Sequence, residues 1–584
     1  MQTQRNESTI PFVGLHAHSV AGSPFDALGY PDEHMDFAYK NGMDALALTD
    51  HGNANGLAGQ VLHAKKMKRM GMDFKPIFGV EAYFIPSVAK WKEEYESIKS
   101  QAKKKSEYEA DQSGTTVENE ASKKKMKSVL NRRRHLILLA QNQEGLQNIF
   151  KMISTSYIGD NFYRYPRVDY ALLKKYNKGV IAASACLGGV YAGSYWENRD
   201  EGPDAILDAM RYTTQKMQSI FGDRWYGELQ WNNIPEQHEL NQYIIQMHHE
   251  FGIELISTAD SHYYNPDVWK DRELYKRLGW LGKGKPDYLS DELPVSVEEI
   301  GYELYPKNGD QMWESYKKYS SLAKSDYNDK LVMDSIKRTY EIAHSRIESF
   351  IPDNTVRLPD FVVPEGSTPG QTLAALCVEG LRGLDLQNNT EYVDRLKYEV
   401  NVIEERGFSK YFLTMKAIAD MAVDRQLVGP GRGSAAGSLV SYVMGITQVD
   451  PIKYGLQFER FLTKGGSGYP DIDYDVSDPM LLKEHLIDEW GDNVVVPITN
   501  WNTLQLRSLI KDISKFYGIE FTEVNNVTSK MVHEATPLAK KAHGITAGVY
   551  APTFEELMLY SETLQKFLEK YPHIKTHVEK LYGQ

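Results

Sequence analysis

The side chains in this sequence best suited to bind metal ions stand at the ends of short apolar runs. His16 and His18 follow Phe12, Val13 and Leu15, and their spacing places both imidazoles on one face of an extended segment. Further along, histidine, carboxylate and thiol groups again open or close apolar runs. In chain order the set is His16, His18, Asp26, His51, Glu81, His135, Cys186, Asp260 and His262.

Taken singly, each of these residues has a plain structural explanation, since a histidine beside a strand is usually a hydrogen-bonded core residue. Their repeated position at strand ends favours a shared site, because the strands of a β/α barrel end at one common edge. The donors outnumber the ligands of one tetrahedral site, so we predict a cluster of roughly two or three divalent ions, including Zn²⁺ or Mn²⁺. Such a cluster suits phosphoester hydrolysis, because bound ions activate water and stabilise the leaving oxygen.

A second group of residues suited to chemistry is the string PDIDYD, which spaces Asp471, Asp473 and Asp475 two residues apart. On an extended strand this period places the three carboxylates on one face and Ile472 and Tyr474 on the other. Carboxylates gathered on one face repel unless cations lie between them, and a pair of metal ions held in this way supports nucleotidyl transfer. An Asp-x-Asp string alone is more often a solvated turn or edge, so the neighbouring segments decide its interpretation.

The deciding neighbour is the glycine-rich stretch GPGRGSAAGS at residues 429–438. Its glycines allow backbone amides to approach a phosphate closely, and Arg432 and Ser434 offer further donors. The stretch differs from a P-loop, because no lysine follows its glycines. Arg460, in QFERFL, adds a cation suited either to triphosphate oxygens or to a neighbouring carboxylate.

The first half of the chain resembles the polymerase and histidinol phosphatase (PHP) domain family through the motifs HAH, TDHGN, GVEAY, HLILLA, SACLGG and ADSH. The resemblance implies a distorted β/α barrel in which the nine donors ligate a trinuclear centre of Zn²⁺ and/or Mn²⁺. It also implies that a chain with the full ligand set acts as a 3'-5' exonuclease. One departure concerns Asp26, because the stretch HAHSVAGSPFD is one residue longer than the family's spacing.

Farther along, the chain closely resembles the family C DNA polymerases of bacteria, in LPDFVVPEG, RLKYEVNVIEERGFSKYFL, VGPGRGSAAGSLVSYVMGITQVDPIKYGLQFERFL and PDIDYD. The resemblance implies an α+β palm of the polymerase β-like nucleotidyltransferase type, with primer-template DNA and deoxynucleoside triphosphates as its partners. In such a palm, Asp471 and Asp473 bind catalytic Mg²⁺, while the triphosphate is held by Gly433, Ser434 and Arg460.

The resemblance also divides the chain into three domains. These are a PHP metal-dependent phosphoesterase domain at 1–280, the first part of the palm at 281–500 and a thumb-like helical region at 501–584. In the family, the palm resumes after the thumb with a third catalytic aspartate. We therefore expect a missing C-terminal region or a second polypeptide to supply the rest of the palm, the fingers and the clamp-binding part, and we expect no polymerisation by this chain alone. Asp475 is expected to be structural.

Three functions stay open at this point. The leading one is template-directed nucleotidyl transfer in DNA replication, with the chain as the N-terminal part of a family C polymerase. The second is that the isolated chain works only as a metal-dependent 3'-5' exonuclease or phosphoesterase. The third is a non-catalytic scaffold, completed by a second polypeptide, in which the metal cluster only stabilises the fold.

The elements that must position these groups alternate short apolar runs with helical stretches between Phe12 and about Tyr264. This rhythm predicts an α/β fold, as a β/α barrel or a layered sheet. Residues 91–134 interrupt it with a run rich in Lys and Glu and without apolar periodicity, which predicts a solvated insertion, helical or partly disordered. Mainly helical segments follow, joined by a Pro/Gly-rich connection after residue 357.

The composition limits the class of protein. With 584 residues, of which 41% are hydrophobic and 25% charged, the chain has the makeup of a multidomain globular protein. Its formal net charge of -12 argues against a nonspecific DNA coat and agrees with carboxylates offset by divalent ions. The two cysteines, Cys186 and Cys377, exclude a disulfide framework. Without a long apolar run or a secretory signal, the sequence predicts a cytoplasmic protein with no membrane association.

Overall fold

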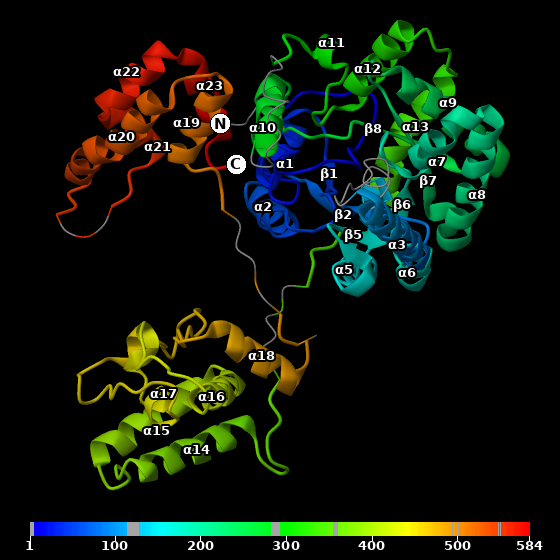
Figure 1. Cartoon of the computed structure of the whole chain (residues 1–584). Coiled ribbons are helices and arrows are strands. Elements are labelled where there is room, and N and C mark those ends of the chain that lie inside the picture. The colour runs from blue at the N-terminus through cyan, green and yellow to red at the C-terminus, as the bar shows by residue number, and fades with distance from the viewer. Residues whose placement is uncertain are drawn as a thin grey trace. The chain divides into compact units, whose positions relative to one another are not determined.

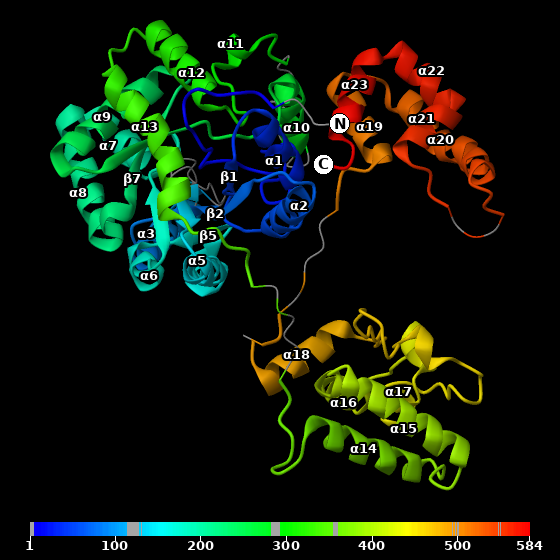
Figure 2. The same ribbon diagram turned by 180° about the vertical axis from the view of Figure 1, so that it is seen from behind.

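The computed structural model describes residues 5–113, 128–129, 131–281, 293–353, 355, 360–492, 494–496, 498, 502–546, 548 and 550–584. The chain folds into two units, which Figures 1 and 2 show from opposite sides. The first unit comprises residues 1–353 and 502–584, and the second comprises residues 354–501. The domain boundaries placed from the sequence, at residues 280 and 500, stay predictions.

An eight-stranded sheet forms the centre of the first unit. Its strands are β1 (Ala45–Leu48), β2 (Lys75–Phe84), β3 (Arg134–Ala140), β4 (Phe162–Tyr163), β5 (Tyr165–Val168), β6 (Val180–Ala183), β7 (Trp225–Gln230) and β8 (Glu254–Thr258). They are ordered β4-β5-β2-β3-β6-β7-β8, with β1 also paired to β2. β3 runs antiparallel to β2 and β6, and β4 runs antiparallel to β5, whereas the other pairs are parallel.

The extended segment at residues 12–18 closes this sheet into a barrel. Gly14 forms a parallel bridge with Leu46 of β1, and Ala17 forms one with Ser261, just beyond β8. The backbone amide of His18 donates to Ser261 O at 2.8 Å. The expected α/β fold with a distorted β/α barrel is thus confirmed, although the closing segment makes isolated bridges rather than a full strand.

Helices cover the outer face of the barrel (Figures 1 and 2). α1 and α2 pack on β1 and β2, α5 on β3 and β5, α8 and α9 on β7, and α13 on β8. Every residue of β1, β6 and β7 is therefore buried. The helices of this part are α1 (Pro31–Lys40), α2 (Leu57–Arg69), α3 (Val88–Ser113), α5 (Gln143–Ser156), α6 (Tyr170–Tyr176), α7 (Val190–Asn198), α8 (Pro203–Phe221), α9 (Pro235–Phe251), α10 (Trp269–Leu281), α11 (Val297–Ile300), α12 (Gly309–Leu322) and α13 (Asp329–Glu341).

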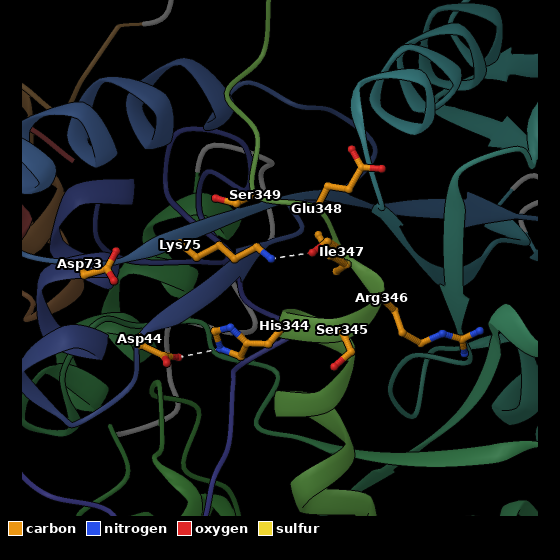
Figure 3. A pocket seen from close by; sticks show the side chains of 9 residues that line it. All are labelled: Asp44, Asp73, Lys75, His344, Ser345, Arg346, Ile347, Glu348 and Ser349. Carbon is orange, nitrogen blue, oxygen red and sulfur yellow. Dashed lines mark hydrogen bonds and ion pairs between the residues drawn. The ribbon is translucent and has the colours of Figure 1, made fainter.

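The interior of the barrel is apolar toward the end where its parallel strands begin, and a π-helical turn, η6 (Ile342–Arg346), closes that end. Ile77 and Ile137 meet there with Ile342 and Ile347. Figure 3 shows the hollow outside this closure. In it Lys75 Nζ donates to Ile347 O at 2.6 Å, and it also donates to the carbonyl of Ala343. The closed end leaves the opposite edge of the barrel for a site.

The charged insertion contains a small apolar core that the sequence reading missed. α3 buries Trp91 and Ile98 against Val129, with Tyr95 packed beside them, and Trp91 Nε1 donates to Val129 O at 2.7 Å. The prediction of a run without apolar periodicity was wrong here, because these α3 side chains stand four and three residues apart and share one helix face. Residues 114–127 and 130 lie outside the described residues.

Residues 502–584 form a helical module that packs onto α10. The buried side chains Leu509 and Val578 of the module share one apolar cluster with Leu274 of α10. In the same contact, His577 Nδ1 lies 2.8 Å from Asp271 Oδ1. The module consists of α19 (Leu506–Phe516), α20 (Phe521–Ala542), α21 (Phe554–Tyr560), α22 (Glu562–Lys570) and α23 (Pro572–Leu581).

The second unit is helical in its described residues. It contains α14 (Pro369–Gly383), α15 (Thr390–Glu405), α16 (Ser409–Val423), α17 (Leu439–Val443) and α18 (Pro479–Trp490). Cys377 is buried in its core. Over residues 360–492 the only strand pairing is an isolated antiparallel bridge between Val428 and Val476. The β part of the expected α+β palm is therefore reduced to one bridge in this stretch, because the carboxylate string meets backbone partners only beside the glycine loop.

In the described part of the chain, no helix combines the length and apolarity needed to cross a membrane.

Candidate functional site

The barrel gathers the predicted metal-binding side chains at the edge where its parallel strands end. They come from the closing segment, from the loop between it and α1, from β2 and β3, and from the loops after β1, β6 and β8. All nine are within one chain of contacts: His16, His18, Asp26, His51, Glu81, His135, Cys186, Asp260 and His262. The sequence therefore identified residues that the fold brings together.

Strand alternation sets the direction of the ligands that lie within strands. Glu81 shares the interior face of β2 with Ile77, and His135 shares that of β3 with Ile137. The same alternation that points these isoleucines into the apolar core thus points an acid and an imidazole into the open end. One strand face serves packing at one end and chemistry at the other.

The innermost group lies around His16. Its Nε2 is 2.8 Å from Glu81 Oε2, 3.0 Å from Asp260 Oδ1 and 3.1 Å from His18 Nε2. His18 Nε2 is itself 3.2 Å from Asp260 Oδ1. All four side chains are buried. Two nitrogens and two oxygens thus surround one point.

A second group shares the other oxygen of Glu81. Glu81 Oε1 lies 2.6 Å from His135 Nδ1 and 2.7 Å from His51 Nδ1. The thiol of Cys186 lies 3.5 Å from His135 Nδ1 and accepts from the amide of Gly188 at 3.4 Å. Glu81 therefore bridges the two groups through its two oxygens.

Asp26 lies at the outer side of the cluster. Its Oδ2 is 3.1 Å from His51 Nε2 and 3.7 Å from His262 Nε2, so the longer spacing in the sequence still delivers this carboxylate to the cluster. Arg272 of α10 donates to Asp26 Oδ1 at 2.8 Å and to its backbone carbonyl at 2.7 Å. The rings of His18, His51 and His262 are packed together, with the centroid of His18 4.2 Å from that of His51 and 4.5 Å from that of His262.

The donor set fits divalent metal ions. His16 Nδ1 is 2.7 Å from Glu228 Oε1, which leaves the Nε2 lone pair facing the oxygens of Glu81 and Asp260. Among the described residues, four buried atoms of the cluster have no hydrogen-bond partner: His18 Nδ1, His51 Nδ1, Glu81 Oε1 and Asp260 Oδ1. A buried imidazole nitrogen and a buried carboxylate oxygen this close to each other need a proton or a metal cation between them. Nitrogen, oxygen and sulfur ligands together suit Zn²⁺ or Mn²⁺.

The electrostatics of the cluster point the same way. Burial tends to raise the pKa of Glu81, but His135 and His51 outweigh it and lower the pKa well below its usual value. Asp260 likewise has a lowered pKa, because His16 and His262 outweigh its burial. Burial raises the pKa of the Cys186 thiol, and the charges of Asp260 and Glu81 raise it further. The carboxylates therefore stay ionised, and the thiol needs a nearby cation to lose its proton.

Glu228 is a functional residue that the sequence reading missed. It is buried on β7, accepts from Thr258 Oγ1 at 2.5 Å and from Gln230 Nε2 at 2.9 Å, and holds His16 through Nδ1. A carboxylate on the far nitrogen of a metal-binding histidine fixes its tautomer and ring orientation. The available signal was an acid inside the apolar strand WYGELQ, which matches Glu81 inside PIFGVEAYF.

Asp50 is a second residue that the sequence reading passed over. Its buried carboxylate accepts from the amide of Ser19 at 2.6 Å and from the Ser23 hydroxyl at 3.0 Å. Burial raises the pKa of Asp50 to about 6, although these hydrogen bonds oppose the rise. A Cβ on Gly22 would lie 2.4 Å from Asp50 Cβ, so the loop packs tightly around this side chain. Asp50 thereby positions the loop that carries Asp26.

The carboxylate string of the second unit lies against the glycine loop. Arg432 Nη1 is 3.2 Å from Asp473 Oδ1, and Arg432 Nε is 2.9 Å from Asp475 Oδ1. Ile472 is buried in the unit's core, so the predicted alternation of polar and apolar faces is seen. The charge of Asp471 also acts on Arg432, whose pKa is raised chiefly by its hydrogen bond to Asp475. Two of the three carboxylates, those of Asp473 and Asp475, thus contact one guanidinium.

Gly433 fixes the approach of the loop. Its φ is 69°, a backbone conformation that favours glycine, and a Cβ there would lie 2.6 Å from Asp473 Oδ2. Next to it, Ser434 is exposed at the start of the 3-10 turn η7 (Ser434–Gly437). The missing side chain at Gly433 therefore allows the loop to lie close to Asp473.

A buried ion pair on α15 supports the same loop from behind. Glu399, which is fully buried, accepts from the amide of Val440 and the hydroxyl of Ser438 at 3.0 Å each. Arg395 donates to Glu399 Oε1 at 2.6 Å and to the carbonyl of Gly437 at 3.0 Å. The long matching stretch RLKYEVNVIEERGFSKYFL therefore carries residues that position the glycine loop.

Arg460 lies on the 3-10 turn η8 (Phe458–Arg460), which packs against η7. Its side chain is exposed, and within the described residues no hydrogen bond or ion pair engages its guanidinium. The fold thus brings Arg460's turn beside the glycine loop while leaving the charge free. Pairing with a neighbouring carboxylate, the alternative left open by the sequence, is not seen among these residues.

Comparisons with known proteins agree with both sites. Residues 14–232 match the PHP domain, and residues 371–579 match the bacterial DNA polymerase III alpha NTPase domain. A DNA polymerase III subunit alpha of Aquifex aeolicus is 32% identical, over 97% of this chain and 44% of its own length. Those of Borreliella burgdorferi and Thermus aquaticus are 32% and 29% identical, over 88% and 81% of this chain and 40% and 39% of their own lengths.

The chain spans about two fifths of the length of these curated relatives. The two matched domains stand in one chain, and the relatives align across both of them. The chain therefore combines a PHP domain with the NTPase domain of bacterial DNA polymerase III alpha subunits, and it aligns with those subunits over most of its length.

Proposed function

We propose that this chain forms the PHP and palm part of a DNA-directed DNA polymerase that extends primers along a template in replication. The observation that carries the proposal is the contact of the glycine loop with the carboxylate string. Gly433 leaves no room for a Cβ beside Asp473, and Arg432 spans Asp473 and Asp475. The match to the polymerase III alpha NTPase domain and the similarity to polymerase III alpha subunits support the same reaction.

In this proposal Asp471 and Asp473 hold two Mg²⁺ ions, which when bound activate the primer hydroxyl and stabilise the leaving pyrophosphate. The backbone amides of Gly433 and Ser434 and the exposed guanidinium of Arg460 hold the incoming triphosphate. Asp475 has a structural role, since both of its oxygens accept from Arg432 Nε. Primer-template DNA and deoxynucleoside triphosphates are the proposed partners, together with whatever polypeptide completes the palm and fingers.

We further propose that the barrel is a metal-dependent phosphoesterase that acts as a 3'-5' exonuclease. The buried, unsatisfied acceptors of the nine-residue cluster favour this second activity. The cluster would hold Zn²⁺ or Mn²⁺, and such ions when bound activate water and neutralise charge on the leaving oxygen. The chain's own contribution is to hold the ligands still, through Glu228 behind His16 and Arg272 beside Asp26.

The two proposals are separated by one pair of substitutions in the complete polymerase. Asp471→Asn is expected to abolish nucleotide incorporation while leaving 3'-end hydrolysis, because it removes an Mg²⁺ ligand of the palm. His16→Ala is expected to do the opposite. Primer extension and release of 3'-labelled nucleotide are measured on both variants, so each serves as the control of the other. If neither substitution changed either activity, both site assignments would be wrong.

A further inference from the structure

Building on the proposed exonuclease, we propose that a group of aromatic and basic residues beside the metal cluster binds the 3' end of single-stranded DNA. The group is called the aromatic platform and consists of Tyr83, Arg133, Tyr157, Phe162 and Tyr165. No residue of it belongs to the nine-residue cluster. The aromatic platform would bind the same single strand that the metal cluster would cleave.

The platform begins at the cluster itself. The Tyr83 ring lies parallel to that of His51, at an interplanar angle of 6° and a centroid distance of 6.1 Å, and 5.7 Å from that of His135. Its other neighbour is Tyr165, with centroids 5.6 Å apart. A nucleotide held on these rings is therefore one ring away from the ligands His51 and His135.

Arg133 supplies a cation for the phosphate of that nucleotide. Its Cζ lies 4.0 Å from the ring centre of Tyr165 and 5.5 Å from that of Tyr83. Its one hydrogen bond among the described residues is to the carbonyl of Asn131, and its buried Nε has no partner. A guanidinium on aromatic faces with donors to spare fits a phosphate group.

The two arginines next to Arg133 in the chain, unlike Arg133, each have a carboxylate partner in the part of the chain that the structure describes. Arg132 pairs with Glu94, and Arg134 pairs with Glu197. Arg133 stands between them in the chain and has no carboxylate partner within the described residues. In a chain of net charge -12, a cation without a carboxylate beside a metal site is suited to an anion from outside.

Exposed rings continue the platform away from the cluster. The rings of Tyr157 and Phe162 are stacked with centroids 5.5 Å apart, and the two side chains are 46% and 42% exposed. Rings held side by side in solvent offer stacking faces to unpaired bases, independently of base identity. Bases within a duplex already stack on one another, so the platform favours a single strand.

The platform is built on a braced hairpin. Phe162 and Tyr165 belong to β4 and β5, which are joined at Arg164. Arg167, buried beneath them, donates to the carbonyls of Tyr163 and Tyr165 at 2.9 and 3.2 Å and lies over the ring of Trp91 at 4.4 Å. The hairpin therefore holds its rings in place before any strand arrives, which reduces the entropy lost on binding.

The experiment measures binding of a 5'-fluorescein oligothymidylate with a free 3' end by fluorescence anisotropy, in EDTA so that no cleavage occurs. Phe162→Ala and Arg133→Gln are each expected to raise Kd roughly tenfold, the scale of one stacked base or one phosphate contact. Arg133→Gln is also expected to reduce the slope of log K against log salt by about 0.7. Matched controls at the closed end of the barrel are Tyr340→Ala and Arg338→Gln, and they are expected to bind as the unchanged chain does.

Binding and cleavage together separate this proposal from the proposed exonuclease. If the unchanged chain binds the oligonucleotide and both platform variants weaken binding, the platform stands even when no cleavage is seen with added Mn²⁺. In a cleaving enzyme, Arg133→Gln is expected to raise KM by a larger factor than it lowers kcat. Cleavage with binding unaffected by either platform variant would overturn the platform and leave the exonuclease intact. An unchanged chain that binds no single-stranded DNA would overturn it as well.

Discussion

At the residue scale, the metal cluster depends on groups that are not ligands. His16 is oriented by Glu228, whose Oε1 also accepts from Thr258 and Gln230. An imidazole held in this way presents one nitrogen in one direction, so the ion meets a ligand that is already in place. Removing the charge behind His16 should therefore weaken metal binding even though all nine ligands are retained.

Glu228→Gln is expected to lower the affinity for Zn²⁺ or Mn²⁺ by roughly 10- to 100-fold, because a neutral amide orients His16 less firmly and makes its ring less basic. Competition with a chromophoric chelator at neutral pH measures the affinity. Glu348→Gln, an exposed acid at the closed end, is the matched control. Equal affinities of the Glu228 variant and the unchanged chain would remove Glu228 from the metal site.

His34 of α1 provides a pH-dependent contribution to stability. It is buried, its Nε2 is 3.1 Å from Leu28 O, and its Nδ1 has no partner among the described residues. Burial is the main cause that lowers its pKa from 6.5 to about 4. Below pH 6.5, His34 binds a proton in the unfolded chain but stays neutral in the folded chain. The unfolding free energy that is present above pH 6.5 is therefore lost as the pH falls toward 4.

His34→Gln keeps a donor for Leu28 O but does not titrate. The unchanged chain is expected to lose about 2 kcal/mol more unfolding free energy than this variant between pH 7 and about pH 4.5. Urea unfolding followed by tryptophan fluorescence at the two pH values gives the difference. Parallel pH dependence in the two proteins would show that His34 titrates normally in the fold.

At the element scale, the approach of the glycine loop to the carboxylate string is set by backbone geometry. Gly433→Ala forces a side chain into a φ of 69° and against Asp473 Oδ2. We expect nucleotide incorporation by the complete polymerase to fall roughly 100-fold, since a displaced metal ligand misaligns the reacting groups. Gly465→Ala, which meets no atom within 4 Å, is the control in the same unit. Primer extension by both variants decides the matter, and full activity of Gly433→Ala would contradict the proposed loop contact.

The closure of the barrel is a second property of elements. Lys75 is the first residue of β2 and donates to the carbonyl of Ile347, as Figure 3 shows. It also donates to the carbonyl of Ala343. Lys75→Met leaves both carbonyls without this donor and is expected to lower the unfolding free energy by about 1–3 kcal/mol. The exposed Lys337→Met on α13 serves for comparison in urea unfolding. No difference between the two variants would mean that the closure is held by its apolar side chains alone.

At the scale of the whole molecule, the apolar core of the helical module at 502–584 is continuous with buried residues of α10. Leu509 and Val578 of the module pack in one cluster with Leu274 and Tyr263 of the barrel. The adjacent Arg272 of α10 holds Asp26, so the same helix supports the module and a residue of the metal cluster. The module is thus expected to stabilise the first unit against unfolding.

A chain that ends at residue 501 is therefore expected to melt at a lower temperature than the full chain, because it exposes the α10 face that the module covers. A chain in which residues 354–501 are replaced by a long Gly/Ser linker keeps this face covered and is expected to melt like the first unit of the full chain. Thermal unfolding followed by tryptophan fluorescence compares the three proteins. Equal melting of the chain ending at 501 would show that the module contributes nothing to the barrel.

The sequence by itself predicted the chemistry that we propose for both sites, because residue type and spacing are local properties. The donors at strand ends predicted one cluster, and the period of two in PDIDYD predicted carboxylates opposite the buried Ile472, as the structure has them. The barrel followed from the alternation of strands and helices. The apolar face of α3 was also readable from Trp91 and Ile98, but the surrounding Lys and Glu concealed it.

Only the tertiary structure decided how separate segments meet. Glu228 gave little signal because its role depends on His16, which is far away in the chain but adjacent in the barrel. The bridge between Val428 and Val476, the position of the module on α10 and the packing of Arg133 on Tyr165 likewise depend on partners distant in sequence. A pattern of apolar residues shows that a face will be covered, but the covering partner is selected by the packing of the whole chain.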